Sequence, residues 1–157
     1  MTENDLIKKV LSSAKTIAMV GVSYNQKDED KKKIIRRPST IVMKYLKEFG
    51  YRVIPINPKY AGKKMYDETI VQKLEDVRIP IDIVNVFRPS KEAPAIAKQS
   101  VKIGARVLWL QFGIKNYEAK EIVESENITY ISNKCIKQEY QKLFLKISPV
   151  LPMLKID

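Results

Sequence analysis

The chain has 157 residues, of which 45% are hydrophobic and 30% are charged, a composition typical of a globular domain with a hydrophobic core. It carries 29 Lys and Arg against 18 Asp and Glu, for a formal net charge of +11, with one cysteine and no histidine. These counts exclude an internal disulfide, Ser-His-Asp or Cys-His catalysis, histidine-based zinc sites and phosphohistidine chemistry.

The positive charge has two interpretations. A basic excess is typical of proteins that bind nucleic acid, anionic membranes or polyphosphate ligands, but it also occurs as a scattered lysine surface. Here the lysines are spread along the whole chain without an arginine-rich stripe, and no apolar run reaches the roughly 18 residues that span a bilayer. We therefore expect binding to neither nucleic acid nor membrane. One cysteine and no visible signal peptide indicate a cytoplasmic protein.

The N-terminal part of the chain predicts a short helix over 5–14 and a buried strand over 16–20. A charged stretch over 24–37 follows, and a loop of this length is usually functional or disordered. Ser39 is placed to cap the next helix, whose apolar residues form one stripe before Gly50 ends it.

Further strands follow in regular alternation with helices. We expect them over 51–56, 81–87, 106–111 and 128–131. The intervening and final helices are expected at 71–74, from Ser90, from Asn116 and over about 137–146, before a surface or disordered tail over 148–157.

This alternation predicts an α/β fold, a Rossmann-like three-layer sandwich around a five-stranded parallel sheet. With the strands numbered along the chain, right-handed crossovers favour the order 3-2-1-4-5, with the topological switch point between strands 1 and 4. We expect a single domain over residues 1–147, in which 1–14 form a leading helix.

Ligands of such sheets bind beyond the carboxyl ends of the strands at the switch point. The segments at those ends are Gly21-Val22-Ser23, Asn57-Pro58-Lys59, Phe87-Arg88-Pro89-Ser90 and Gln111-Phe112-Gly113.

Gly21 lets the backbone turn sharply and approach a ligand, and the Ser23 hydroxyl can donate to a phosphate oxygen. The alternative is that Gly21 only ends a buried strand. The turn does not read G-x-G-x-x-G, so it favours a nucleotide-type ligand other than the usual nicotinamide or flavin dinucleotide.

Arg37 and Ser39 stand at a predicted helix N-terminus, which favours anions, although Ser39 could be a simple cap and Arg37 a solvated charge. Dinucleotide-binding domains place Asp or Glu after the second strand to hold ribose hydroxyls. Here Lys59 favours a phosphorylated ribose, and the alternative is an Asx-Pro turn with an exposed lysine.

Arg88 could reach the same crevice, and the segment from Gln111 offers amide and backbone groups opposite Gly21, although Phe112 could equally pack in the core. Cys135 is either a reactive thiol beside a lysine or, more commonly, a small buried hydrophobe. Carboxylate pairs suited to acid–base work do not stand out, so no catalytic constellation is predicted.

These segments resemble those of the small stand-alone CoA-binding domain proteins, relatives of the CoA-binding domain of succinyl-CoA synthetase alpha subunits. The resemblance covers about residues 15–145. The matching stretches are Ala18 to Ser23, Arg37-Pro38-Ser39, Val42 to Leu46, Gly50 to Pro58, Val86-Phe87-Arg88, Ile103-Gly104-Ala105, Leu108 to Gln111 with Gly113, and Cys135-Ile136-Lys137 followed by Glu139-Tyr140.

The resemblance implies a Rossmann-like fold that binds coenzyme A or a short acyl-CoA. The implied contacts are Gly21, Val22 and Ser23 at the pyrophosphate, flanked by Arg37 and Ser39; Asn57, Pro58 and Lys59 near the adenosine and its 3′-phosphate; and Leu110, Gln111, Phe112 and Gly113 on the far wall. With Phe87 and Arg88 these form the candidate binding set.

The leading hypothesis is a CoA-binding module without catalysis of its own. Two alternatives stay open: a subunit of an acyl-CoA ligase or transferase that acts with a protein partner, and an NAD(P)-binding regulator. The synthetase's phosphohistidine has no counterpart here, because the chain lacks histidine. A homo-oligomer is compatible with either role.

Overall fold

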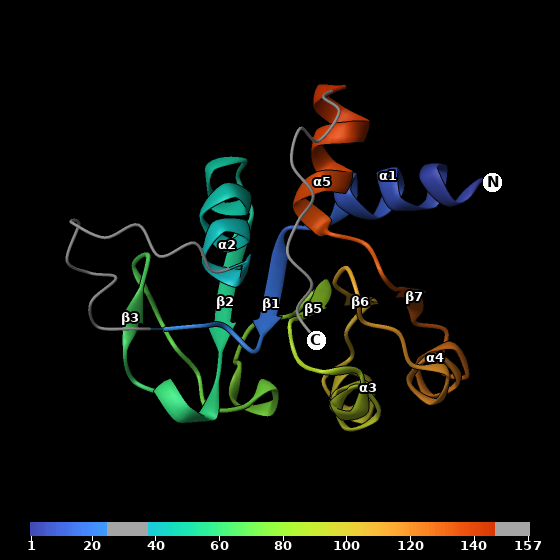
Figure 1. Ribbon diagram of the computed structural model, residues 1–157. Coiled ribbons are helices and arrows are strands. Elements are labelled where there is room, and N and C mark those ends of the chain that lie inside the picture. The colour runs from blue at the N-terminus through green and yellow to red at the C-terminus, as the bar shows by residue number, and fades with distance from the viewer. Residues whose placement is uncertain (25–37, 147–157) are drawn as a thin grey trace.

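Five parallel strands form one sheet in the computed structural model, with helices on both faces (Figure 1). The structure describes residues 1–24 and 38–146. The strands are β1 (Thr16–Val20), β2 (Arg52–Ile56), β5 (Ile83–Val86), β6 (Val107–Leu110) and β7 (Thr129–Ile131). The predicted α/β class and parallel five-stranded sheet are confirmed.

The helices form two layers (Figure 1). One face of the sheet carries α1 (Glu3–Ser13), α2 (Pro38–Glu48) and α5 (Ile136–Tyr140), which one π-helical turn over Gln141–Leu145 extends; the other carries α3 (Ala93–Lys102) and α4 (Tyr117–Glu124). Successive side chains of a strand point to opposite faces, so Ile17 and Met19 pack in one core cluster and Ala18 in the other. The three-layer sandwich follows from this alternation.

The strand order is β2-β1-β5-β6-β7, or 2-1-3-4-5 when the five strands are numbered along the chain. It differs from the expected 3-2-1-4-5 in the place of the third strand, which pairs with both β1 and β6 and not with β2. All four residues of β5 are buried, as a strand covered on both faces and both edges requires. The switch point therefore lies between β1 and β5, because β2 follows on one side of β1 and the later strands on the other.

The stretch between β2 and β5 contains short elements. They are the 3₁₀ turns η2 (Pro58–Tyr60) and η3 (Leu74–Asp76) and a two-stranded antiparallel ribbon of β3 (Lys64–Met65) and β4 (Glu68–Thr69). The helix expected at 71–74 does not form, because Val71 makes a parallel bridge with Ile56. The segment that follows β2 thus folds back along the sheet edge.

The other predicted helices form with shifted ends. The residues from Ser90 to Glu92 make a 3₁₀ turn, η4, ahead of α3. Residues 25–37, with Arg37 among them, and the expected tail over 148–157 lie outside the described residues. Within the described ranges, no helix is long and apolar enough to cross a membrane.

Candidate functional site

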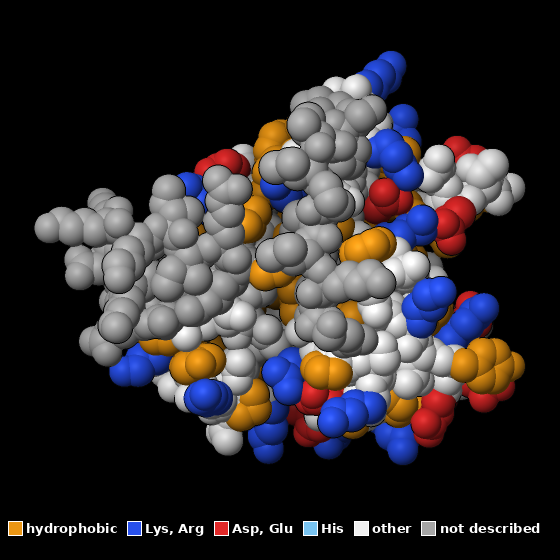
Figure 2. All heavy atoms as spheres, in the orientation of Figure 1, with side chains coloured by type: hydrophobic (Ala, Val, Ile, Leu, Met, Phe, Trp, Pro, Cys, Tyr) orange, Lys and Arg blue, Asp and Glu red, His pale blue; other side chains and the backbone are white. Residues whose placement is uncertain are grey.

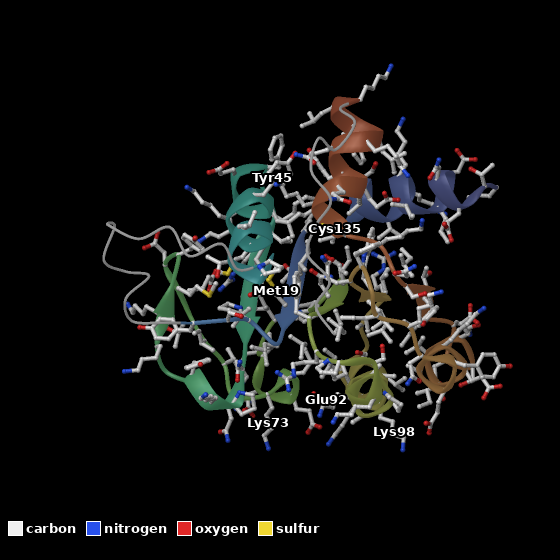
Figure 3. The ribbon with its side chains drawn as sticks, viewed as in Figure 1. Met19, Tyr45, Lys73, Glu92, Lys98 and Cys135 are labelled. Atoms are coloured by element: carbon white, nitrogen blue, oxygen red, sulfur yellow. The ribbon has the colours of Figure 1, made fainter. Side chains whose placement is uncertain are left out.

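A cleft of about 1220 Å³ opens at the carboxyl ends of β1, β2 and β5, at the switch point of the sheet. Its walls come from the turn after β1, from η2 after β2, from the start of η3, and from η4 with the exposed side of α3. Figure 3 labels Lys73 and Glu92 at this end of the molecule, beyond the carboxyl ends of β1 and β2. The described lining includes seven candidate residues, Gly21, Val22, Ser23, Asn57, Pro58, Lys59 and Arg88.

Gly21 forms the turn that opens the cleft. Its φ is +92°, a conformation that side-chain-bearing residues rarely adopt, and a Cβ there would lie 2.5 Å from Cδ of Arg88. Phe87, which is buried, brings its backbone carbon to 3.2 Å from the same position. Glycine is therefore required both by the backbone conformation and by the close approach of the chain after β5.

The backbone N–H groups of this turn already donate within the chain. Gly21 N–H and Val22 N–H donate to the Ile56 carbonyl at 2.9 and 3.3 Å, and Ser23 N–H donates to Oγ of Ser39 at 2.8 Å. Ser39 lies in the first turn of α2 and is buried, so its hydroxyl holds the turn after β1 in place. In this conformation, the ligand groups available at the turn are side chains and not its amides.

Asn57 joins the first two strand ends. Its Nδ2 donates to the Val22 carbonyl at 2.8 Å, and its Oδ1 accepts from Lys59 N–H at 3.0 Å, which caps η2. The Asx-Pro turn that the sequence allowed is thus present, with Pro58 in the first position of the 3₁₀ turn. The side chain of Lys59 is exposed on this turn, and its Nζ lies 5.4 Å from the ring centroid of Tyr60.

The cleft is strongly basic. Its described lining holds four exposed lysines and one arginine against a single carboxylate, Glu92. None of these lysines has a carboxylate within 4.0 Å among the residues that the structure describes; they are Lys59, Lys63, Lys73 and Lys91. Figure 2 shows Lys and Arg side chains along the lower edge of the molecule, with Asp and Glu side chains among them. A hollow lined by uncompensated positive charge attracts a polyanion.

Arg88 differs from these lysines because it is paired. Its Nη2 lies 2.8 Å from Oε2 of Glu92 and its Nε 3.2 Å from Oε1, so the two side chains form a two-point ion pair four residues apart. This pair stands on the wall formed by η4 and α3.

Two tyrosines also line the cleft. Tyr24 and Tyr60 approach with ring centroids 5.5 Å apart and an interplanar angle of 53°. Sequence reasoning missed both, together with Lys63, Lys73 and Lys91. The only signal for them was their position in irregular segments next to strand ends.

The segment after β6 is not brought into this cleft. Leu110 and Gln111 are buried, and Oε1 of Gln111 accepts from Asn85 Nδ2 at 3.1 Å and from Ile136 N–H at 3.0 Å. Phe112 packs against the core cluster under α1, α2 and α5, and Gly113 N–H donates to Asn133 Oδ1 at 2.8 Å. The strand order explains the separation, because β6 lies one strand farther from β1 than expected.

Cys135 lies in the core, 3% exposed, at the residue that precedes α5. Burial raises the pKa of its thiol. Both observations favour the small buried hydrophobe over the reactive thiol. Among residues 1–24 and 38–146, no group of three or more Asp, Glu and Cys side chains is arranged to hold a metal ion.

Comparison with known proteins relates the chain to a family and to a larger enzyme. The family model described as CoA binding domain matches residues 15–141. The uncharacterized protein YneT of Bacillus subtilis is 36% identical over 135 residues, which covers 83% of this chain and 89% of that protein. The ADP-forming acetate–CoA ligase of Methanocaldococcus jannaschii is 32% identical over 148 residues, covering 87% of this chain but 19% of the ligase.

Solved structures share the fold. The cell-free ID.343 protein of Thermus thermophilus superposes with a TM-score of 0.80 at 31% identity, covering 91% of this chain and all of that chain. A hypothetical protein of Pyrococcus horikoshii OT3 gives a TM-score of 0.80 at 30% identity, and the match covers 90% of this chain and 92% of that protein. A Rex-family repressor, RSP, matches with a TM-score of 0.54 at 18% identity over 82% of this chain and 57% of the repressor, which shows a shared fold alone.

Proposed function

Because the chain belongs to the CoA-binding domain family, we propose that it binds coenzyme A or a short acyl-CoA in the cleft at the ends of β1, β2 and β5, without catalysis of its own. One observation carries the assignment of the site: a cleft of about 1220 Å³ whose four lysines have no carboxylate partner among the described residues. Coenzyme A carries a pyrophosphate and a 3′-phosphate, which is the kind of ligand such a charge distribution attracts.

The residues present fit the chemistry of that ligand. Lys59, Lys63 and Lys73 would provide ammonium donors for the phosphates, and Ser23, which lines the same hollow, would provide a hydroxyl. The ring of Tyr60 provides a flat apolar surface against which an adenine base could stack. Arg37, expected at the pyrophosphate, remains part of the proposal from sequence alone.

The residue after β2 argues against a nicotinamide dinucleotide. Domains that bind NAD hold the ribose hydroxyls with a carboxylate at this point, whereas Asn57 stands here with its side chain bonded to Val22 and Lys59. The NAD(P)-binding regulator is therefore the weaker candidate, even though a related RSP structure, 18% identical to this chain, is a complex with beta-NADH.

The ligase relative supports a second candidate. This chain spans about a fifth of the acetate–CoA ligase, so it could supply the CoA-binding part of a ligase whose other domains reside on a partner chain. CoA-dependent turnover that requires a co-purifying partner would support this role, and CoA binding without such a partner favours the stand-alone module. For either role we propose a cytoplasmic location, in which Cys135 and the ligand thiol stay reduced.

The experiment that tests the proposal combines ligand identification with calorimetry. Purified protein is denatured, and the released small molecules are identified by mass spectrometry. Titrations with CoA, acetyl-CoA, dephospho-CoA, NAD and NADP then compare affinities. We expect CoA or acetyl-CoA to bind most tightly and dephospho-CoA more weakly. Binding of NAD or NADP with no binding of any CoA species would contradict the proposal.

A further inference from the structure

We infer that Glu92 is a specificity-determining residue of the cleft: its carboxylate occupies the Nε and Nη2 donors of Arg88, and a ligand phosphate must displace it to bind that edge of the guanidinium. As an account of CoA recognition this inference rests on the proposed function. The pairing itself and its effect on simple anions do not depend on it.

The ion pair is held in the position that this role requires. The Cγ and Cδ atoms of Arg88 run directly over Gly21, as the distances of 2.8 and 2.5 Å from a Cβ placed on that glycine show. This contact fixes the direction in which the guanidinium leaves the backbone, so Arg88 lines the cleft and meets Glu92, the last residue of η4. Among the described residues, the neighbouring Lys91 has no such carboxylate partner.

Glu92 is also accessible to an incoming ligand. It precedes α3 directly, where the positive end of the helix dipole stabilises a carboxylate. The side chains of Arg88 and Glu92 are 43% and 39% exposed, so an incoming anion can approach both. Exposed pairs of this kind contribute little net stability, so either partner can be exchanged.

The consequence is discrimination by charge. A ligand with one carboxylate that displaced Glu92 would replace it with an equivalent group and gain nothing at that edge of Arg88. A pyrophosphate carries more charge and more acceptor oxygens, so it can displace Glu92 and also engage the unpaired lysines. Glu92 therefore lowers the affinity for anions at Arg88 and favours multiply charged ligands, which also contact the lysines.

The test compares Glu92→Gln with Glu68→Gln by calorimetry, using inorganic pyrophosphate and CoA as separate probes. Glu68 pairs with Arg52 outside the cleft lining, so its variant changes the net charge equally without touching the site. We expect Glu92→Gln to bind pyrophosphate and CoA about fivefold more tightly and Glu68→Gln to bind them as the original chain does. The gain should vanish when Arg88→Gln is combined with Glu92→Gln.

Equal or weaker binding of pyrophosphate by Glu92→Gln than by Glu68→Gln would overturn the inference, as would failure of pyrophosphate to bind any of the variants, or binding of CoA to the original chain without a gain in Glu92→Gln. If pyrophosphate shows the expected gain and CoA binds none of the proteins, the inference stands for simple polyphosphates and the proposed function fails. Thermal unfolding of each variant confirms that the compared proteins are folded.

Discussion

The ends of β1 and β6 look alike in sequence but differ in the folded chain. Each strand is buried and leads within three residues to a glycine with positive φ, Gly21 at +92° and Gly113 at +89°. After β1 the chain opens into a cleft whose lysines have no carboxylate partner among the described residues. After β6 the polar groups are turned inward, where Gln111 bonds Asn85 and the backbone of Ile136.

This contrast shows that a glycine turn at the end of a parallel strand does not define a binding site. The distinguishing feature is whether the surrounding polar groups find partners inside the protein. Around Gly21 the backbone amides are satisfied and the charged side chains are left over for a ligand. Around Gly113 both backbone and side-chain groups bond the chain after β6 to Asn133, before α5, and to Ile136, its first residue. We therefore expect substitutions at the two ends to have separable effects on affinity and stability.

The largest effect on stability is expected after β6, where the polar groups are bonded inside the protein. Gln111→Ala removes the acceptor of two buried donors and leaves a cavity, so the free energy of unfolding should fall by about 3 kcal/mol. Urea denaturation measures this change. Gln72→Ala, on the exposed rim of the cleft, is the matched control and should alter stability by less than about 0.5 kcal/mol. CoA affinity of folded Gln111→Ala should stay within about twofold of the original; a larger loss of affinity would place this segment in the site.

Two glycine variants separate the cost of backbone strain from the cost of steric crowding at the turn after β1. Gly21→Ala should lower the free energy of unfolding by about 2 to 3 kcal/mol, because the new Cβ meets Arg88 in addition to the strain of positive φ. Gly50→Ala, at φ +95° with no atom within 4 Å, carries the strain alone and should cost about 1 kcal/mol. Equal losses for the two variants in urea denaturation would show that the chain after β5 does not approach Gly21 closely.

Removal of a cleft lysine should affect affinity and leave stability unchanged. Lys73→Ala is expected to weaken CoA binding about threefold to tenfold, because a charged donor to phosphate is lost. Lys102→Ala removes the same charge from a surface pair with Glu75 outside the cleft lining and should leave the Kd unchanged. If both variants weaken binding equally, the net charge and not the cleft determines affinity.

The smallest expected effect is that of salt. Exposed lysines are screened by mobile ions, so raising NaCl from about 50 to 500 mM should weaken CoA binding about threefold. The hydrogen bonds of Gln111 are buried, so the same change should leave the urea midpoint nearly constant. Calorimetry and denaturation in the two buffers make this comparison. Affinity that does not respond to salt would argue against a site built from lysines.

The fold class could be predicted because it depends on local alternation. Strands rich in buried apolar residues and helices with one apolar stripe dictate a sandwich without any long-range information. The strand order could not be predicted, because a right-handed crossover from β2 can place the next strand either beyond β2 or on the other side of β1. The structure shows β5 between β1 and β6, and the four buried residues of β5 are the sign of an interior strand.

The candidate site was predicted in part for the same reason. The glycine turn, Asn57 and Lys59 follow strand ends that can be identified locally, and they share the cleft. The lysines at 63, 73 and 91 could not be assigned, because the folding of η2, η3 and η4 around the cleft depends on long-range contacts. Ser39 shows the opposite case: a serine at a helix start suggests a cap, but its hydroxyl accepts a hydrogen bond from Ser23 N–H.

The most direct test of the central claim is a titration of ¹⁵N-labelled protein with CoA, followed by amide chemical shifts. If the cleft is the CoA site, saturable shifts should be concentrated at Gly21 to Tyr24, Asn57 to Lys63 and Arg88 to Glu92, with little change from Gln111 to Gly113. Shifts concentrated at Gln111 to Gly113, or no shifts at millimolar CoA, would contradict it.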